Sequence, residues 1–208
     1  MNKGRFIVLE GVEGAGKSTA SDFVQQWLAG QGRTVVATRE PGGTPAAERI
    51  RALLLDPATG GLDALTELLL MFAARRENVI NVIEPALARG QDVVCDRFTD
   101  ASHAYQGAGR GLGARPVEVL SELVHPGLVP DLVLILDLPV AVGRHRIAER
   151  GNGHDRIEDN RIEFFERVRQ AYLERAAREP GRYAVVDASQ EVEAVKAQLE
   201  RVLSERLR

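Results

Sequence analysis

The feature that most constrains this chain is a glycine-rich octapeptide that directly follows a short apolar run near the N-terminus. The run covers residues 6–10, and residues 11–18 read GVEGAGKS, a full match to the pattern GxxxxGK[ST]. This pattern requires a strand before it and a helix after it, because its backbone N–H groups converge on phosphate oxygens at a helix start. The sequence therefore predicts a phosphate-binding loop made of Gly11, Val12, Glu13, Gly14, Ala15, Gly16, Lys17, Ser18 and Thr19.

Each part of this loop has a defined use in holding a nucleotide. The glycines let the backbone approach the phosphates, Lys17 is expected to reach the β- and γ-phosphates, and the hydroxyl of Ser18 is expected to ligate Mg²⁺. An accidental glycine-rich turn beside a surface lysine explains the match far less well, because it does not account for the flanking strand and helix. The sequence therefore predicts that the chain binds ATP or GTP, but the loop does not identify an acceptor.

Short apolar runs alternate with longer segments of helical spacing along the rest of the chain. This alternation is typical of a parallel sheet covered by helices on both faces, in one α/β domain. Pro85 is expected to bend or divide the third helical segment. Any ligand is expected beyond the carboxyl ends of the strands. The runs lie at residues 6–10, 34–38, 92–95, 132–137 and 183–186, and the helical segments at residues 18–30, 44–55, 63–89, 114–124, 140–149, 158–178 and 191–206.

The overall composition excludes several classes of protein. With 208 residues, 44% of them hydrophobic and 27% charged, the chain resembles neither a disordered nor a membrane protein. Its net charge of −3 argues against a general nucleic-acid binder. No apolar stretch approaches the roughly 18 residues of a membrane span, and no export signal is recognisable, so we expect a cytoplasmic protein with no membrane partner. The single cysteine, Cys95, lies in an apolar run and is expected to be a buried strand thiol.

Two classes of nucleotide-binding protein remain: a phosphotransferase with a second substrate pocket, and a nucleotide-driven switch or binding module. A switch of the usual GTPase kind carries a DxxG element, but no aspartate in this chain is followed three residues later by glycine. A transfer enzyme instead needs arginines from several segments to hold two polyanions in line. The chain carries such arginines in three clusters.

The three clusters differ in how strongly they indicate a function. The motif TREPGGT contains Arg39 and a Pro-Gly-Gly turn with Thr44 as the expected N-cap of a helix, which an ordinary loop explains equally well. Asp96 and Arg97 follow the third strand, where a carboxylate can engage Mg²⁺ and an arginine can grip an acceptor phosphate. A lone dipeptide of this kind is more often a surface salt bridge. The segment RGNGHDR at residues 150–156 suits either a lid over phosphates or a solvated linker.

Taken together, these motifs resemble those of the bacterial thymidylate kinase family. The segments FIVLEGVEGAGKST, TREPGGT, LLLMFAARR, CDRFTDASHAYQGAGRG, PDLVLILDLP and DRIE occur in the order and spacing of that family, from residue 5 to about residue 187. The resemblance implies the P-loop fold of nucleoside monophosphate kinases, with a five-stranded parallel sheet flanked by helices on both faces and a small lid at about residues 150–158. It also implies the reaction of ATP with dTMP to give ADP and dTDP, in dTTP biosynthesis, with Mg²⁺ accompanying ATP.

The resemblance assigns two base-binding roles to the third helical segment. It implies that Phe72 stacks on the thymine ring and that Arg76 hydrogen-bonds the edge of the base. From helical spacing alone, Leu68, Met71 and Phe72 more often indicate a helix with an ordinary core face.

Other positions also match functional residues of that family. Ser102 and Gln106 match positions that contact the base, and Tyr105 matches an aromatic residue near the deoxyribose that disfavours a 2′-hydroxyl. Glu13 matches the carboxylate near the sugar 3′-hydroxyl and the acceptor phosphate. The acceptor-site arginines implied by the resemblance are Arg39, Arg51 and Arg97. Of these, Arg51 is equally consistent with an ordinary charged residue on a helix surface.

The source of the catalytic arginine differs within that family. Some members carry it inside the P-loop, at the position of Gly14, and others supply it from the lid. With Gly14 in the loop and Arg150 and Arg156 in the lid segment, this chain resembles the lid-arginine type. No general base is needed, because the acceptor phosphate is already an anion. The catalytic set expected from the resemblance is Lys17, Asp96, Arg97, Arg150 and Arg156.

Several alternatives stay open at this point. Thymidylate kinases are typically homodimers, and the apolar segment at residues 63–89 suits a two-fold interface, although such a stripe is more often internal core. His103 is expected either as a solvated loop residue or as a group that tunes the polarity of the pocket. The competing functions are another (deoxy)nucleoside monophosphate kinase and a non-catalytic nucleotide-binding P-loop module.

Overall fold

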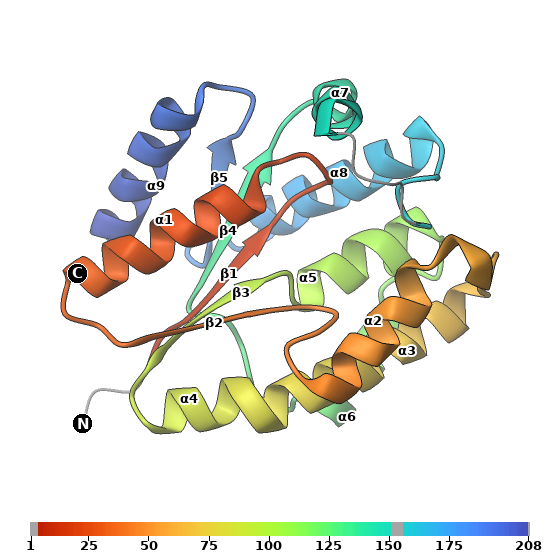
Figure 1. Cartoon of the computed structure of the whole chain (residues 1–208), viewed down its shortest axis with the longest axis horizontal. Helices are drawn as coiled ribbons and strands as arrows, with labels where there is room; N and C mark the ends of the chain where they lie inside the picture. The colour runs from red at the N-terminus through yellow and green to blue at the C-terminus, as the bar shows by residue number, and fades with distance from the viewer. Residues whose placement is uncertain (1–3, 151–155, 208) are drawn as a thin grey trace.

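The chain is built around a five-stranded sheet in which every strand runs parallel to its neighbours. The computed structural model describes residues 4–150 and 156–207, without the side chain of Arg150. The predicted α/β fold with five parallel strands is confirmed, and β1 lies at the centre of the sheet (Figure 1). The strands are β1 (Phe6–Glu10), β2 (Val35–Arg39), β3 (Asp92–Asp96), β4 (Leu132–Asp137) and β5 (Tyr183–Asp187), in the order β2-β3-β1-β4-β5.

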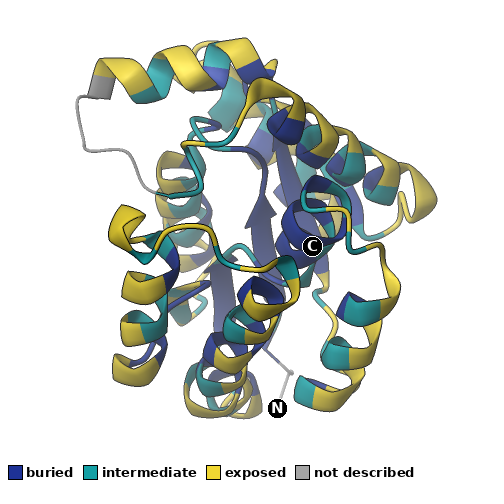
Figure 2. Cartoon of the chain, turned by 90° about the vertical axis from the view of Figure 1, so that its right-hand side faces the viewer, coloured by how far each residue is buried: buried dark blue, intermediate teal, exposed yellow. Residues whose placement is uncertain are grey.

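The strands form where β-branched and apolar residues run continuously, because a sheet covered on both faces buries every side chain of its inner strands. All five residues of β1 are buried, and Val8 pairs with Cys95 of β3 on one side and with Val133 of β4 on the other. Figure 2 shows the buried positions gathered in the strands and on the helix faces turned toward them. The apolar runs predicted from the sequence agree with these strands to within one residue at each end.

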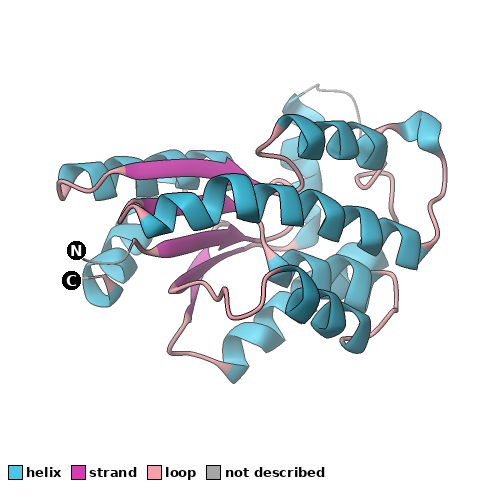
Figure 3. Cartoon of the chain, turned by 90° about the horizontal axis from the view of Figure 1, so that it is seen from below, coloured by secondary structure: helices cyan, strands magenta, loops and turns pink. Residues whose placement is uncertain are grey.

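Helices cover both faces of the sheet (Figure 3). On one face, α1 (Lys17–Gly30) and α9 (Val192–Arg206) pack against each other. On the other face lie α4 (Glu84–Ala88), α5 (Thr99–Ser102) and α8 (Ile162–Arg178). Of the remaining helices, α2 packs on α3, α6 packs on α3, and α7 packs on α8. These are α2 (Pro45–Leu55), α3 (Ala64–Asn78), α6 (Arg115–Val124) and α7 (Val140–Arg150), and a 3₁₀ turn at Pro57–Thr59 follows α2.

Two segments differ from the sequence-based expectation. The long segment at residues 63–89 is divided into α3, a π-helical turn at Val79–Ile83 and α4, and the wide turn stands directly before Pro85, whose ring nitrogen cannot donate a hydrogen bond. Residues 99–109, for which the periodicity predicted no helix, form α5 and a π-helical segment at His103–Gly109. Hydrophobic spacing does not reveal this helix because several of its buried side chains are polar: Asp100, Ser102 and Gln106.

The structure also bears on the cysteine and on the possibility of a membrane span. Cys95 is a buried thiol within β3, as predicted, and its Sγ donates to the carbonyl oxygen of Arg97 at 3.0 Å. In the part of the chain that the structure describes, no helix combines the length and the apolar character needed to cross a bilayer.

A buried carboxylate at the end of β1 connects the sheet to two helices. One oxygen of Glu10 accepts the backbone N–H groups of Phe98 at 2.8 Å and Ala101 at 3.1 Å, and the other accepts the hydroxyl of Tyr172 at 2.7 Å. The central strand is thereby tied to the first turn of α5 and to α8. Burial raises the pKa of Glu10 to about 7, and the negative charge of Asp100 acts in the same direction.

This raised pKa predicts a pH dependence of stability. The Glu10 carboxyl has a pKa of about 7 in the folded chain, compared with its ordinary value of 4.5 in the unfolded chain. The folded chain therefore binds this proton more tightly, and the resulting contribution to the free energy of unfolding falls as pH rises from about 4.5 through 7. We expect Glu10→Gln, which does not titrate, to lack this loss. Urea unfolding at about pH 5 and about pH 8 should show the stability of the wild type falling relative to that of the variant. An equal difference at both pH values would contradict the assignment.

Candidate active site

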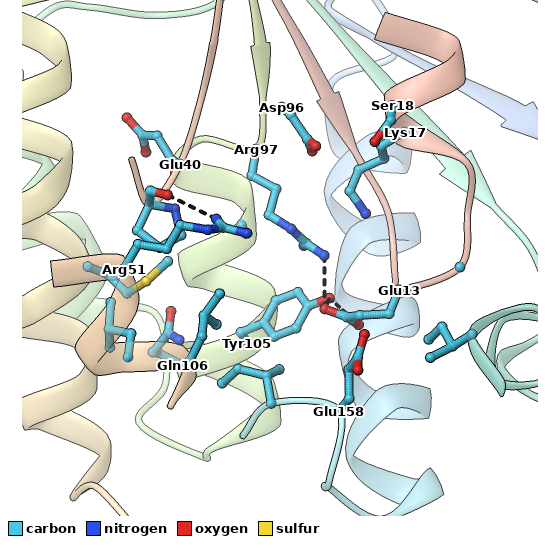
Figure 4. Close-up of a pocket in the computed structure, with 18 of the residues that line it drawn as sticks. Glu13, Lys17, Ser18, Glu40, Arg51, Asp96, Arg97, Tyr105, Gln106 and Glu158 are labelled. Carbon is cyan, nitrogen blue, oxygen red and sulfur yellow. Dashed lines mark hydrogen bonds and ion pairs between the residues drawn. The ribbon is translucent and has the colours of Figure 1, made fainter. Parts of the chain in front are cut away.

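A cavity of 350 Å³ opens at the carboxyl ends of β1 and β3, between the glycine-rich loop, α2, α3 and the π-helical segment. The loop lies on one side of this cavity with Lys17 and Ser18, and Arg51 and Gln106 lie on the opposite side (Figure 4). Parallel strands end at the same edge of the sheet, which is why residues distant in the chain meet here.

The glycine-rich loop has the geometry of an anion cradle. Gly14 and Gly16 have positive φ values of 77° and 84°, which bend the backbone around the start of α1. The Nζ of Lys17 donates to the carbonyl oxygens of Gly11 at 3.0 Å and Val12 at 3.1 Å. Burial, together with the nearby charge of Arg97, lowers the pKa of Lys17 to about 8. A cation held in this way is suited to neutralising an incoming polyanion.

Gly14 lies in backbone contact with the first half of α7. A side chain at this position would overlap the carbonyl oxygen of Gly143, and a Cβ added to Gly143 would lie 2.5 Å from the carbonyl oxygen of Glu13. An arginine therefore does not fit at position 14 on this backbone. The expectation that the lid segment supplies a catalytic arginine stays a prediction.

The turn after β3 directs a charged cluster into the cavity. Arg97 has a positive φ of 70°, unusual for a residue with a side chain, and its Nη2 donates to Glu13 at 2.9 Å while its guanidinium lies 4.7 Å from the ring centre of Tyr105. The Tyr105 hydroxyl donates to the same carboxylate at 2.7 Å (Figure 4). Asp96 also lines the cavity, and its Oδ1 is buried without a hydrogen-bond partner. The cluster thus offers a carboxylate oxygen and a guanidinium beside the loop.

The other two predicted acceptor-site arginines lie apart. Arg51 lines the cavity, and its Nη1 donates to the carbonyl oxygen of Pro41 at 2.9 Å (Figure 4). Arg39 is more than half exposed, pairs with Glu48 at 2.9 Å and lines a separate shallow groove beside β2. The structure therefore brings Arg51, but not Arg39, to the cavity.

The two base-binding residues expected on α3 do not reach the cavity. Phe72 is 2% exposed and packs with Leu68 and Val117, with its ring stacked on His125 at a centroid distance of 6.2 Å. Arg76 points outward and donates to the carbonyl oxygen of Val124 at 2.9 Å. Both side chains face α6. Met71, one residue before Phe72, faces the cavity instead, because consecutive side chains on a helix point about 100° apart.

Two residues of α3 line the cavity, Glu67 and Met71. Arg75 lies on the same helical stripe, one turn after Met71, but it is fully buried and does not line the cavity itself. The sequence analysis missed this stripe, although the spacing of 67, 71 and 75 was present as a signal. Both faces of α3 carry apolar residues and an arginine, so the sequence alone does not indicate which face is turned toward the cavity.

Arg75 is a fully buried cation held on several sides. Its Nε donates to Glu40 at 2.6 Å, and its Nη2 donates to the carbonyl oxygen of Phe98 at 2.9 Å and to the hydroxyl of Ser102 at 3.1 Å. The guanidinium lies 4.3 Å from the ring centre of Phe72 and 5.1 Å from that of Phe98. Its Nη1 is buried with no partner, so both N–H groups on this nitrogen are left without an acceptor. Ser102 is fully buried and contacts Arg75 rather than lining the cavity.

The expected lid is described only in part. Arg156 donates from Nη2 to Glu67 at 2.6 Å and from Nε to the carbonyl oxygen of Leu54 at 2.7 Å, so it lies against α2 and α3. The side chain of Arg150, for which a catalytic role was predicted, lies outside the described residues. The same holds for the centre of the lid, residues 151–155.

A second groove lies on the outer side of the loop. It has a volume of 380 Å³ and is formed by the loop, the start of α9 and the chain after β5, with Arg146 donating to the carbonyl oxygen of Ala188 at 2.9 Å. Sequence analysis did not identify Arg146. The groove is continuous with the glycine-rich loop through Gly14, Gly16 and Thr19, which border both hollows.

His103 lies away from both grooves. It lines a small hollow of 170 Å³ between the π-helical segment and α8, with Arg175 and Arg178. Burial lowers the pKa of His103 to about 4, and the charge of Arg175 adds to the effect. The residue is therefore neither a solvated loop residue nor a part of the main cavity.

Several known proteins resemble this chain in sequence and in architecture. A family model described as thymidylate kinase matches residues 9–199. A thymidylate kinase from Chromohalobacter salexigens is 56% identical over 208 residues, covering 100% of this chain and 98% of the relative, and one from Pseudomonas putida is 56% identical over 200 residues, covering 96% and 95%. A crystal structure of thymidylate kinase from Ehrlichia chaffeensis superposes with a TM-score of 0.79 at 33% identity, covering 97% of this chain and 99% of that chain. The chain therefore belongs to the thymidylate kinase family and is an ATP-dependent phosphotransferase.

Proposed function

We propose that the cavity holds dTMP opposite the triphosphate of ATP and that the γ-phosphoryl group passes directly between them. The observation that carries this proposal is a pair of buried, unpartnered polar atoms: the donor Nη1 of Arg75 and the acceptor Oε1 of Gln106. A buried polar group without a partner is costly, so a ligand that completed the hydrogen bonding of these two atoms would be bound more tightly. A pyrimidine that offers a carbonyl oxygen next to a ring N–H matches this pair.

The donor nucleotide is proposed to bind through the glycine-rich loop. Backbone N–H groups of residues 11–19 and the Nζ of Lys17 would hold the phosphates, as the geometry of the loop supports. The adenine would then occupy the outer groove beside Arg146, because that groove shares Gly14, Gly16 and Thr19 with the main cavity. Both ends of ATP are thereby given a defined position.

The residues beside the loop also fit a magnesium ion. The hydroxyl of Ser18 borders the cavity, and Asp96 adds a carboxylate oxygen that is buried without a partner. Oxygen ligands of this kind are those that Mg²⁺ prefers. When bound with ATP, the ion would reduce the repulsion between the phosphates.

The acceptor is proposed to lie across the remaining cavity. Arg51 and Arg97 would hold its phosphate, and Tyr105 and Glu13 would contact its sugar, where the aromatic ring leaves little room for a 2′-hydroxyl. The base would rest against Met71. Arg75 and Gln106 would bind the edge of that base.

Transfer in this arrangement needs positioning and charge rather than a base. An anionic oxygen of the dTMP phosphate would attack the γ-phosphorus, and the bond to the β-bridging oxygen would break to release ADP. Lys17 and Arg97 would neutralise the transferring group from the loop side. A lid arginine would complete the set, and for Arg156 this requires release from Glu67.

Assembly and location remain part of the proposal. We infer a homodimer because α3 and α6 pack together and carry exposed apolar side chains, and sedimentation at micromolar concentration would measure it. Cytoplasmic location follows from the proposed soluble substrates and would be measured by cell fractionation. The exposed apolar side chains are Leu65, Leu69, Val119 and Leu123.

The activity is tested by measuring ADP release with MgATP and a panel of monophosphates: dTMP, dUMP, dCMP, dGMP, dAMP and the ribonucleotides. We expect dTMP to be the best acceptor, and we expect Lys17→Ala to abolish turnover because the phosphates lose their buried cation. This variant also controls for contaminating kinases. Preference for another monophosphate would contradict the assignment of the base pocket. ATP binding without any turnover would contradict the assignment of phosphotransferase activity.

Adjacent arginines on α3 provide a matched pair of variants. We expect Arg75→Lys to raise the KM for dTMP by about tenfold or more, because lysine keeps the charge but cannot present Nη1 while it remains paired with Glu40. Arg76→Lys, on the face turned toward α6, should leave this KM within about twofold. Steady-state kinetics at saturating ATP measure both. Equal effects of the two substitutions, or a larger effect at position 76, would refute the base contact of Arg75.

The lid arginine is tested in the same way. We expect Arg156→Ala to lower kcat by at least about 10²-fold with little change in dTMP affinity, because it removes charge that acts on the transferring group. Arg161→Ala, an exposed arginine five residues further along, serves as the control. A raised KM for dTMP with a near-normal kcat would show instead that Arg156 only anchors the segment to Glu67.

A further inference from the structure

One buried carboxylate gathers the polar groups at the far end of the cavity. Glu67 is 1% exposed in the first turn of α3. Its Oε1 accepts the side-chain amide of Gln106 at 2.8 Å and Arg110 at 3.3 Å, and its Oε2 accepts Arg156 at 2.6 Å and Arg110 at 3.2 Å. Three side chains, two from the π-helical segment and its C-cap and one from the segment after α7, thus donate to a single carboxylate.

The ionised state of Glu67 decides how Gln106 is oriented. Burial opposes ionisation, but the hydrogen bonds from Gln106 and Arg156 and the charge of Arg110 outweigh it and hold the pKa of Glu67 below its usual value. An ionised carboxylate can only accept hydrogen bonds. The amide of Gln106 must therefore present its –NH₂ group to Glu67, and its carbonyl oxygen cannot point there.

The carboxylate itself is held in place by a second residue, Arg110. Arg110 donates to both oxygens of Glu67, and its Nη1 donates to Asn160 at 2.6 Å. Its guanidinium also lies 4.7 Å from the ring centre of Phe164. Because Glu67 cannot rotate away, Gln106 has one stable amide orientation, with Oε1 buried and unpartnered beside the cavity that the residue lines.

We propose that Glu67 is the positioning residue that sets base selectivity, by fixing the carbonyl oxygen of Gln106 toward the bound base. This rests on the proposed function, in which the acceptor base lies against Gln106. A fixed acceptor pairs with the ring N–H of thymine or uracil. Cytosine presents an unprotonated ring nitrogen at the same position, so two acceptors would face each other and the hydrogen bond would be lost.

The substitution Glu67→Gln tests this role with little change in shape. A carboxamide can donate as well as accept, so the amide of Gln106 is no longer held in one orientation. We expect the ratio of kcat/KM for dTMP to that for dCMP to fall by about tenfold, mainly through a higher KM for dTMP, because the donor Nη1 of Arg75 would still oppose the amino group of cytosine. The ratio for dTMP to dUMP should stay unchanged, because both bases carry the same ring N–H. Glu77→Gln, on the same helix, is the matched control.

A double-mutant cycle separates this role from the contacts of Glu67 with Arg110 and Arg156. In the background of Gln106→Ala, the substitution Glu67→Gln should not change the dTMP to dCMP ratio further. A fall in kcat or in the melting temperature with an unchanged ratio would overturn the proposal, and so would an equal fall in the Gln106→Ala background. If the variant does not fold, NMR of the wild-type Gln106 amide decides: a free –NH₂ group, unprotected from exchange, would overturn the proposal.

The outcomes also distinguish this proposal from the one on which it rests. A wild-type enzyme that phosphorylates neither dTMP nor dUMP would overturn the proposed function and the role of Glu67 together. A wild-type enzyme selective for dTMP, with an unchanged ratio in Glu67→Gln, would overturn only the role of Glu67.

Discussion

The placement of the whole site depends on the carboxylate at the end of the central strand. Glu10 accepts the first N–H groups of the helix that follows β3, so the chain must turn sharply between Asp96 and Phe98. That turn gives Arg97 its positive φ and directs its side chain across Tyr105 toward Glu13. The same carboxylate binds the hydroxyl of Tyr172, which in turn accepts a hydrogen bond from Arg97 at 3.1 Å. A single buried carboxyl group therefore fixes both the backbone and the side chain of Arg97.

The buried pair of Arg75 and Glu40 extends this logic to the acceptor side. Removing one partner of a buried ion pair leaves an uncompensated charge and costs about 3–5 kcal/mol, so the two side chains hold each other in place. Phe72, which does not contact the cavity, contributes by stacking on the guanidinium together with Phe98. The aromatic residue of α3 thus packs on the buried guanidinium of Arg75 and does not line the cavity.

Much of the fold and the donor side of the site could be predicted from the sequence, because their signals are local. The glycine-rich loop specifies its own backbone conformation, and continuous apolar runs specify buried parallel strands. The acceptor side could not be predicted in the same way. Whether Phe72 or Met71 faces the cavity depends on the packing of α3 against α6, which is a tertiary contact. Neither α5 nor the π-helical segment that carries Gln106 shows apolar periodicity, and both contact carboxylates elsewhere in the chain, α5 through Glu10 and the π-helical segment through Glu67.

The contact between Gly14 and Gly143 has a consequence for how such a chain can vary. The two glycines touch through their backbones, so neither position can accept a side chain while the other segment stays where it is. A side chain at either position would therefore require α7 to move relative to the glycine-rich loop. The backbone contact between these two segments thus restricts which residues positions 14 and 143 can carry, and a single substitution at either one would have to be accompanied by a movement of a helix.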